Sequence, residues 1–111
     1  MPTMPRQITP AELATRLAAA LPPRLLDVRQ PGEHARAALP DSRLIPLNEL
    51  PGRVAELGDW RGADIVVYCH HGVRSLHAAE FLGMAGFDQV ASLTGGIDAW
   101  SVNIDPRVPR Y

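Results

Sequence analysis

The chain has 111 residues, a net charge of −1 and hydrophobic side chains at 46% of its positions, which fits one globular domain with its own core. All 11 cations are arginines, spread along the chain among 12 acidic residues, so no basic field for nucleic acid or an anionic membrane is expected. No apolar run approaches the roughly 20 residues of a membrane span. The single cysteine cannot form an internal disulfide and no secretory leader is recognisable, so we expect a cytoplasmic protein.

Helix and strand patterns alternate along the chain without repeats or low-complexity segments. The clearest helix start is Thr9, since Pro10 suits the first helical position and Glu12 completes a capping box. The clearest strand is 65–68, because it is apolar and largely β-branched on both faces. In chain order we expect a helix at 9–21, a strand at 25–28, a short helix at 33–37, a strand at 43–45, a helix at 47–58, a strand at 65–68, a helix at 75–86, a strand at 89–93 and a short helix at 97–100.

This alternation predicts an α/β fold with a central parallel β-sheet flanked by helices on both faces. In such sheets, ligands bind beyond the carboxyl ends of the strands. Cys69 directly follows the strand at 65–68 and is therefore expected at that end. A lone cysteine is most often a small buried hydrophobe, but two histidines, a glycine and an arginine follow this one closely, which favours a chemical role.

The segment after Cys69 is a strand-to-helix loop, which predicts an anion site. Backbone N–H groups at such a turn, the helix N-terminus and the guanidinium of Arg74 direct positive potential to one place. This environment favours the thiolate, which is the reactive form of cysteine. The candidate site consists of the nucleophile Cys69 and the surrounding substrate-binding residues His70, His71, Gly72, Val73, Arg74 and Ser75.

Most of the loop side chains have two interpretations. Gly72 either adopts a positive φ beside the bound sulfur or is a plain turn glycine. Arg74 either recognises an anionic donor as a planar fork or forms a surface ion pair. Ser75 is most simply a helix cap, and the alternative is a hydroxyl directed at the sulfur. His70 and His71 point to different sides and are expected to shape or protonate the donor end of the pocket, with no metal bound.

The loop length separates two kinds of cysteine chemistry. Four residues lie between Cys69 and Arg74, and the loop of cysteine-dependent phosphatases is one residue longer. A shorter loop closes a smaller ring of amides, which suits one extra sulfur atom on Cys69 better than a tetrahedral phosphate. The stretch resembles the active-site loop of the rhodanese (sulfurtransferase) family.

The resemblance continues outside the loop, over residues 8–100. Segments similar to the family's motifs are 25–29 with Pro31 and Glu33, 85–87 and 93–100. The segment 36–42 departs from the family pattern, so no site contacts are carried over to it. Residues 101–111 resemble the end of rhodanese domains fused to adenylyltransferases that sulfurate carrier proteins.

The resemblance implies a single rhodanese-like domain at 1–111 and a sulfurtransferase that carries sulfur as a Cys69 persulfide, without a cofactor. The implied donor is a small molecule such as thiosulfate or a protein persulfide, and the acceptor is a thiophilic compound or a protein. Supporting roles beside the loop are implied for Asp27, Arg29 and Glu33. Two alternatives stay open: a non-catalytic interaction module, and a phosphatase or arsenate reductase related by fold.

Overall fold

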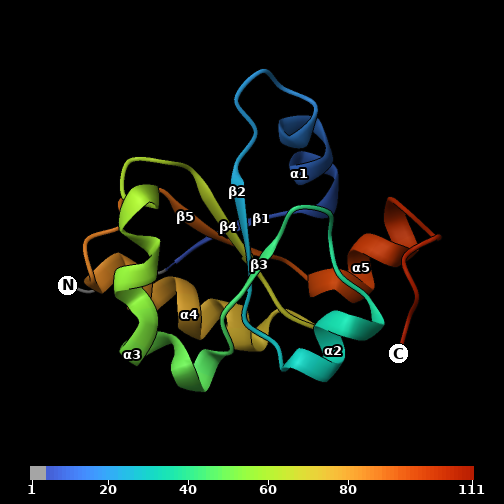
Figure 1. Cartoon of the computed structure of the whole chain (residues 1–111). Helices are drawn as coiled ribbons and strands as arrows, with labels where there is room; N and C mark the ends of the chain where they lie inside the picture. Colours follow the sequence, from blue (N-terminus) through green and yellow to red (C-terminus); the bar gives the residue numbers. More distant parts are fainter. Residues whose placement is uncertain (1–4) are drawn as a thin grey trace.

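A computed structural model gives the structure of the chain and describes residues 5–111. Five strands form one parallel sheet in the order β1-β5-β4-β2-β3 (Figure 1). The strands are β1 (Arg6–Ile8), β2 (Arg24–Asp27), β3 (Arg43–Leu44), β4 (Ile65–Tyr68) and β5 (Val90–Leu93). The predicted α/β fold with a central parallel sheet is confirmed.

Helices connect the strands and cover both faces of the sheet (Figure 1). They are α1 (Pro10–Leu17), α2 (Pro31–Arg36), α3 (Leu50–Arg53), α4 (Val73–Met84) and α5 (Gly96–Asn103), with the 3-10 segments η1 (Leu47–Glu49) and η2 (Val54–Trp60) on either side of α3. Residues of α3 and α4 share a core on one face, whereas α1 and α5 contact each other on the opposite face. Within residues 5–111, no helix is both long and apolar enough to cross a membrane.

Side chains of β4 alternate between two hydrophobic cores, one on each face of the sheet. Val66 and Tyr68 lie in the core that contains residues of α1 and α5. Ile65, Val67 and Cys69 lie in the core that contains residues of α3 and α4. Each of these side chains is buried, because β4 is a central strand covered on both faces. The alternation therefore directs the Cys69 side chain toward the face that α4 covers.

The chain leaves the sheet in opposite directions after β2 and after β4. From β2 it continues to β3 at one edge, whereas from β4 it continues to β5 on the other side. Strands β2 and β4 pair from Arg24 with Ile65 to Asp27 with Tyr68, so their carboxyl ends meet at this topological switch point. Ligands of open α/β sheets bind at such a point, and Cys69 directly follows β4 there.

Four elements differ from the sequence prediction. The first helix ends at Leu17 and not at residue 21, because Leu21 is 90% exposed and has no core to pack against. Residues 6–8 form an unpredicted edge strand, which is too short to show an alternating pattern. The stretch 47–60 is divided into 3-10 and α segments, since a proline and glycines inside it weaken a continuous helix. The last helix is longer than predicted and spans Gly96–Asn103.

Candidate active site

Cys69 begins the loop between β4 and α4, and three groups from this loop and the first turn of α4 surround its sulfur. The backbone N–H of Gly72 donates to Sγ at 3.1 Å, and that of Ser75 donates at 3.3 Å. The Ser75 hydroxyl lies 3.5 Å from Sγ. Cys69 is 1% exposed, so these groups act on the sulfur where little water screens them. Donors therefore surround position 69 as the sequence predicts.

Gly72 makes this geometry possible. Its φ of 103° lies in the left-handed region, which glycine adopts without a side-chain penalty. The residue is the N-cap of α4, so the helix begins directly after it. The prediction of Ser75 as the cap is therefore wrong, because Ser75 lies inside the first turn of α4. Its buried hydroxyl instead faces the sulfur, which was the alternative interpretation.

The first turn of α5 anchors the loop from a second direction. The N–H groups of Ile97 and Asp98 donate to the carbonyl oxygens of Cys69 at 2.9 Å and His70 at 3.1 Å. These N–H groups belong to the helix terminus, where no intrahelical acceptor exists. A Cβ at Gly96 would overlap the same two carbonyl oxygens. The sequence predicts a short helix at 97–100 but not this contact, and the adjacent glycines that precede it are the signal of the close approach.

Arg74, in the first turn of α4, pairs with Glu33 of α2. Its Nη1 and Nη2 donate to the two carboxylate oxygens of Glu33 at 2.7 and 3.0 Å, which is a bidentate contact. The hydrogen bonds from Arg74 lower the pKa of Glu33 to about 2 despite its partial burial. The same contact raises the pKa of Arg74. Both groups are therefore charged at neutral pH, and the guanidinium is held in an ion pair.

A second charge pair is fully buried at the end of β2. Arg29 donates from Nε and Nη2 to Asp27 at 2.9 and 2.7 Å, and both residues are 0% exposed. Burial acts to lower the pKa of Arg29, but its hydrogen bonds with Asp27 and Tyr111 outweigh burial and raise the pKa. The Nδ1 atom of His34 lies 2.7 Å from a carboxylate oxygen of Asp27. These contacts hold the end of β2 beside the loop.

Three aromatic rings stack at the loop. The His70 ring lies 4.0 Å from the Tyr111 ring at an interplanar angle of 9°, and 3.9 Å from the His71 ring at 27°. The prediction that His70 and His71 point to different sides is therefore wrong, because β4 ends at Tyr68 and strand alternation does not extend into the loop. Burial lowers the pKa of His70, and the neighbouring His71 lowers it further, so His70 is neutral at pH 7. Its buried Nε2 has no hydrogen-bond partner among the described residues. The exposed His71 places Nδ1 3.9 Å from Asp98.

Two residues that the sequence did not single out complete the site. The Tyr111 hydroxyl bridges Arg29 and Glu33, and the Ser92 hydroxyl lies 2.7 Å from that of Ser75. Neither residue belongs to a local motif, because both reach the site through the tertiary fold. The structure thus gathers all ten predicted residues except Val73 into direct contacts with one another or with the sulfur. The side chain of Val73 points outward and is exposed.

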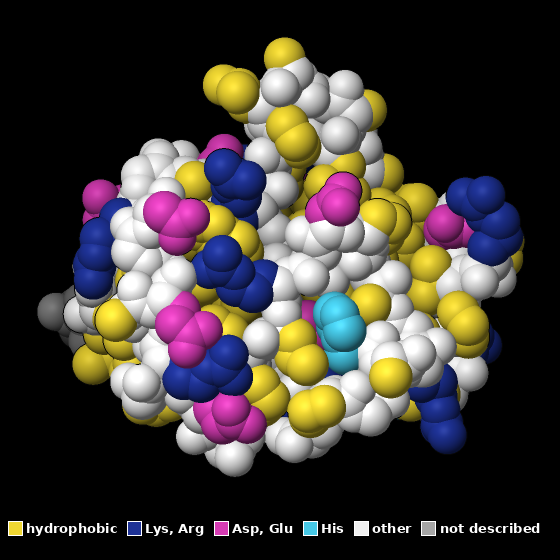
Figure 2. Space-filling view, in the orientation of Figure 1, with side chains coloured by type: hydrophobic (Ala, Val, Ile, Leu, Met, Phe, Trp, Pro, Cys, Tyr) yellow, Lys and Arg dark blue, Asp and Glu magenta, His cyan; other side chains and the backbone are white. Residues whose placement is uncertain are grey.

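Most charged side chains around the site are paired, but Arg36, whose Cζ lies 5.9 Å from the Tyr111 ring centroid, has no acidic partner among the described residues. The ion pairs at the switch point are Asp27–Arg29, Glu33–Arg74 and Asp98–Arg110. Figure 2 likewise shows arginine and acidic side chains next to one another on the face in view, without a patch of one sign. Across residues 5–111, no group of three or more His, Cys, Asp or Glu side chains could hold a metal ion.

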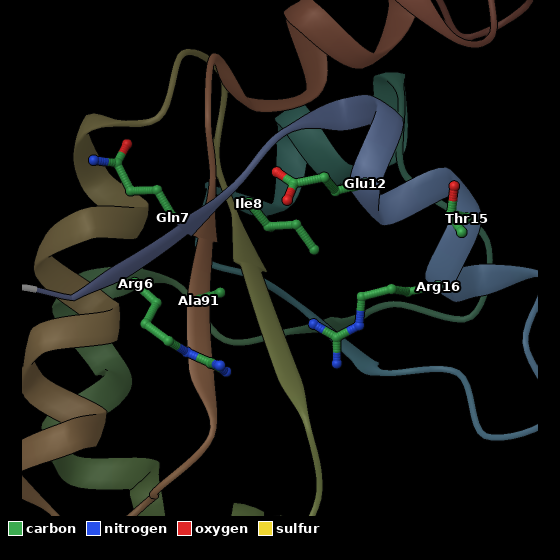
Figure 3. A pocket seen from close by; sticks show the side chains of 7 residues that line it. All are labelled: Arg6, Gln7, Ile8, Glu12, Thr15, Arg16 and Ala91. Carbon is green, nitrogen blue, oxygen red and sulfur yellow. The ribbon is translucent and has the colours of Figure 1, made fainter.

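A surface pocket of about 400 Å³ lies next to β1 and α1 (Figure 3), and its lining includes no residue of the Cys69 loop. Its lining residues are Arg6, Gln7, Ile8, Glu12, Thr15, Arg16 and Ala91. None of them contacts Cys69 or its hydrogen-bonding groups. Most are exposed side chains, and Arg16 is already paired with Asp64. The groups that can carry chemistry therefore lie at the switch point of the sheet and not in this pocket.

Comparisons with known proteins identify the family of the chain. The rhodanese-like domain model matches residues 9–103. A sulfurtransferase of Allochromatium vinosum is 37% identical over 98 residues, which cover 88% of this chain and 90% of that protein. The probable adenylyltransferase/sulfurtransferase MoeZ of Mycobacterium tuberculosis is 37% identical over 107 residues, 94% of this chain but only 26% of that protein. A rhodanese-related protein of Thermoplasma volcanium has a crystal structure that superposes with a TM-score of 0.79 at 34% identity, covering 94% of this chain and 95% of that one. With this fold, this loop and these relatives, the chain belongs to the rhodanese-like domain family.

Proposed function

We propose that this protein is a sulfurtransferase that moves a sulfane sulfur from a donor to a thiophilic acceptor through a persulfide on Cys69. The observation that carries the proposal is the pair of N–H groups, from Gly72 and Ser75, that donate to Sγ at 3.1 and 3.3 Å. Such donors stabilise a thiolate, and a thiolate is the nucleophile that this chemistry needs. The sulfurtransferase names of relatives at 37% identity support the same reaction class.

The proposed reaction balances without a cofactor. With thiosulfate, the Cys69 thiolate attacks the outer sulfur, the S–S bond of the donor breaks, and sulfite leaves with the electron pair. Cys69 then carries the outer sulfur as a persulfide anion. A nucleophilic acceptor attacks that terminal sulfur, its bond to Sγ breaks, and Cys69 returns as a thiolate. Each step is a displacement at sulfur, so no external oxidant or reductant is consumed.

The ion pairs around the site affect which sulfur donor it favours. Arg74 is paired with Glu33, and Arg110 is paired with Asp98, so these two guanidinium groups offer a dianion such as thiosulfate little net positive charge. A persulfide carried on a protein brings less charge to the site. We therefore propose a protein persulfide as the preferred donor and thiosulfate as a convenient assay substrate.

Intact-mass measurement after incubation with thiosulfate or a small-molecule persulfide tests the proposed intermediate. Because Cys69 is the only cysteine, a persulfide adds one sulfur mass at one known position, and cyanide or a reductant removes it. The matched control Cys69→Ser gains no sulfur. Failure of both donors to add sulfur would contradict the proposal and favour an interaction module. If the protein adds no sulfur but hydrolyses an aryl phosphate, the thiol is assigned to phosphatase chemistry.

A further inference from the structure

Two buried serines extend the hydrogen bonding of Cys69 into the core. Ser75 comes from α4 and Ser92 from β5, and both are 0% exposed. Their hydroxyl oxygens lie 2.7 Å apart, and Ser75 Oγ lies 3.5 Å from Cys69 Sγ. Ser92 is in the interior of the sheet, paired with Gln7 of β1 and Val67 of β4. A hydroxyl at such a place costs free energy unless it is hydrogen bonded, so its partner matters.

Counting protons determines the direction of these hydrogen bonds when Cys69 is ionised. A thiolate only accepts, so Ser75 must donate its one hydroxyl hydrogen to Sγ for that contact to exist. Ser92 can then donate to Ser75, and every hydroxyl hydrogen has an acceptor. In the reverse direction, the Ser92 hydrogen has no acceptor among the described residues, since Ser75 is the hydrogen-bond partner of Ser92 Oγ there. The thiolate would also lose the hydrogen bond from the Ser75 hydroxyl.

The neutral thiol does not require this direction. Its S–H can donate weakly to Ser75, which then donates to Ser92. A hydrogen bond from a hydroxyl to a charged sulfur is stronger than one between neutral groups. Fixing the Ser75 hydroxyl toward Sγ therefore stabilises the thiolate more than the thiol.

We propose that Ser92 is a positioning residue for sulfur transfer, because it donates to Ser75 and thereby directs the Ser75 hydroxyl at the anionic sulfur of Cys69. This inference deepens the proposed function and rests on it. Cys69 is a thiolate twice in that reaction, once as the nucleophile and once as the leaving group. The Ser92 side chain is fully buried and hydrogen bonds to Ser75, so a sulfur donor that arrives from solvent does not reach it. Its loss therefore lowers kcat and leaves KM for the donor nearly unchanged.

The pH dependence of Cys69 alkylation by iodoacetamide isolates this effect, because only the thiolate reacts. In Ser92→Ala, we expect the pH midpoint of alkylation to rise and the rate at pH 7 to fall roughly three- to tenfold. The other titratable and charged groups beside the loop come from every element packed against it: His70 and His71 in the loop, Arg74 of α4, Asp27 and Arg29 at the end of β2, Glu33 of α2, Asp98 of α5, and Tyr111. The substitution alters none of them.

Two further variants separate positioning from simple packing. Ser92→Thr keeps a hydroxyl and should restore the midpoint. In a Ser75→Ala background, Ser92→Ala should cause no further shift of the alkylation midpoint, because the hydroxyl through which Ser92 acts on the sulfur is already absent. The matched control is Ser101→Ala, which removes another buried serine whose hydroxyl donates to the carbonyl of Val108. This control should leave the midpoint unchanged.

The outcomes are distinct from those of the persulfide experiment. If Ser92→Ala lowers only the melting temperature and leaves the alkylation midpoint unchanged, Ser92 is a packing residue and the inference is overturned. An additive shift in the Ser75→Ala background overturns it as well. Alkylation requires no sulfur donor. A shifted midpoint therefore supports the donation from Ser92 through Ser75 to the sulfur even if no persulfide forms with any donor.

Discussion

The hydroxyl of Tyr111 donates to the carboxylate of Glu33 at 2.9 Å across 78 positions of sequence. The same oxygen accepts from Arg29 Nη1 at 2.6 Å. Because a guanidinium only donates and a carboxylate only accepts, the hydroxyl proton must lie toward Glu33. Burial raises the pKa of Tyr111, so the hydroxyl keeps this proton at neutral pH. One side chain thus joins the buried Asp27–Arg29 pair to the Glu33–Arg74 pair beside the loop.

Tyr111→Phe should lower the free energy of unfolding by about 1–2 kcal/mol, because it removes both hydrogen bonds of the hydroxyl. Arg29 Nη1 would keep only a 3.4 Å contact with the carbonyl of Glu33. This contact is too long to replace the lost hydrogen bond to the buried guanidinium. The phenylalanine ring would still stack on His70. Urea unfolding measures the change. Arg107→Ala in the same tail is the control, since its exposed ion pair with Asp105 contributes little. Equal stabilities of the two variants would contradict the bridging role.

Local signals account for what the sequence predicts of the fold. Thr9 and Glu12 form the predicted capping box, and β4 lies at the apolar run 65–68. Both features depend on residues within a few positions of one another. Strand β1 could not be predicted in this way, because its three residues are extended through pairing with β5 more than 80 positions away.

The same distinction between local signals and distant contacts applies to the site. The positive φ of Gly72 follows from the residue type and the turn around it. The partner of Arg74 could not be predicted, since Glu33 lies 41 positions away, and the same holds for the contacts of Ser92 and Tyr111. A single sequence contains no signal for which distant polar groups meet. The resemblance indicated that Glu33 supports the fold, but the structure identifies what it holds.

The low pKa of Glu33 predicts a loss of stability in acid. Its pKa is about 2 in the folded protein, compared with an ordinary value of 4.5, so its contribution is full above about pH 4.5 and is lost as the pH falls toward 2. Allowing for partial exposure, this loss is roughly 2 kcal/mol. In Glu33→Gln, unfolding free energies measured over this range should fall less steeply. Exposed Glu80 is the control, and a Glu80→Gln profile indistinguishable from that of Glu33→Gln would count against the assignment.

Arg74 can serve the donor, the ion pair or both, and two substitutions with opposite charge effects separate these roles. Arg74→Ala removes the cation and should raise KM for thiosulfate about three- to tenfold. It should also lower the unfolding free energy at neutral pH by up to about 2 kcal/mol, because Glu33 loses the hydrogen bonds that lower its pKa most. Glu33→Gln keeps the cation, releases it from the carboxylate, and should lower that KM. Steady-state kinetics at constant ionic strength measure both changes. An unchanged KM in both variants would restrict Arg74 to holding α2 against α4.

Gly96→Ala should disrupt the loop, because α5 approaches the carbonyls of Cys69 and His70 only where no side chain intervenes. The φ of 63° adds backbone strain for alanine. We expect a loss of about 2–4 kcal/mol in unfolding free energy and slower alkylation of Cys69 in the fraction that remains folded.

Gly83→Ala is the matched control for this prediction. A Cβ there meets no atom within 4 Å, and the residue lies in the last turn of α4, so alanine should stabilise the helix by up to about 0.5 kcal/mol. Urea unfolding and alkylation rates for the two variants decide the matter. If Gly96→Ala matched Gly83→Ala in unfolding free energy and in alkylation rate, contact with α5 would not hold the loop carbonyls in place. The amides around the sulfur would then be positioned in another way.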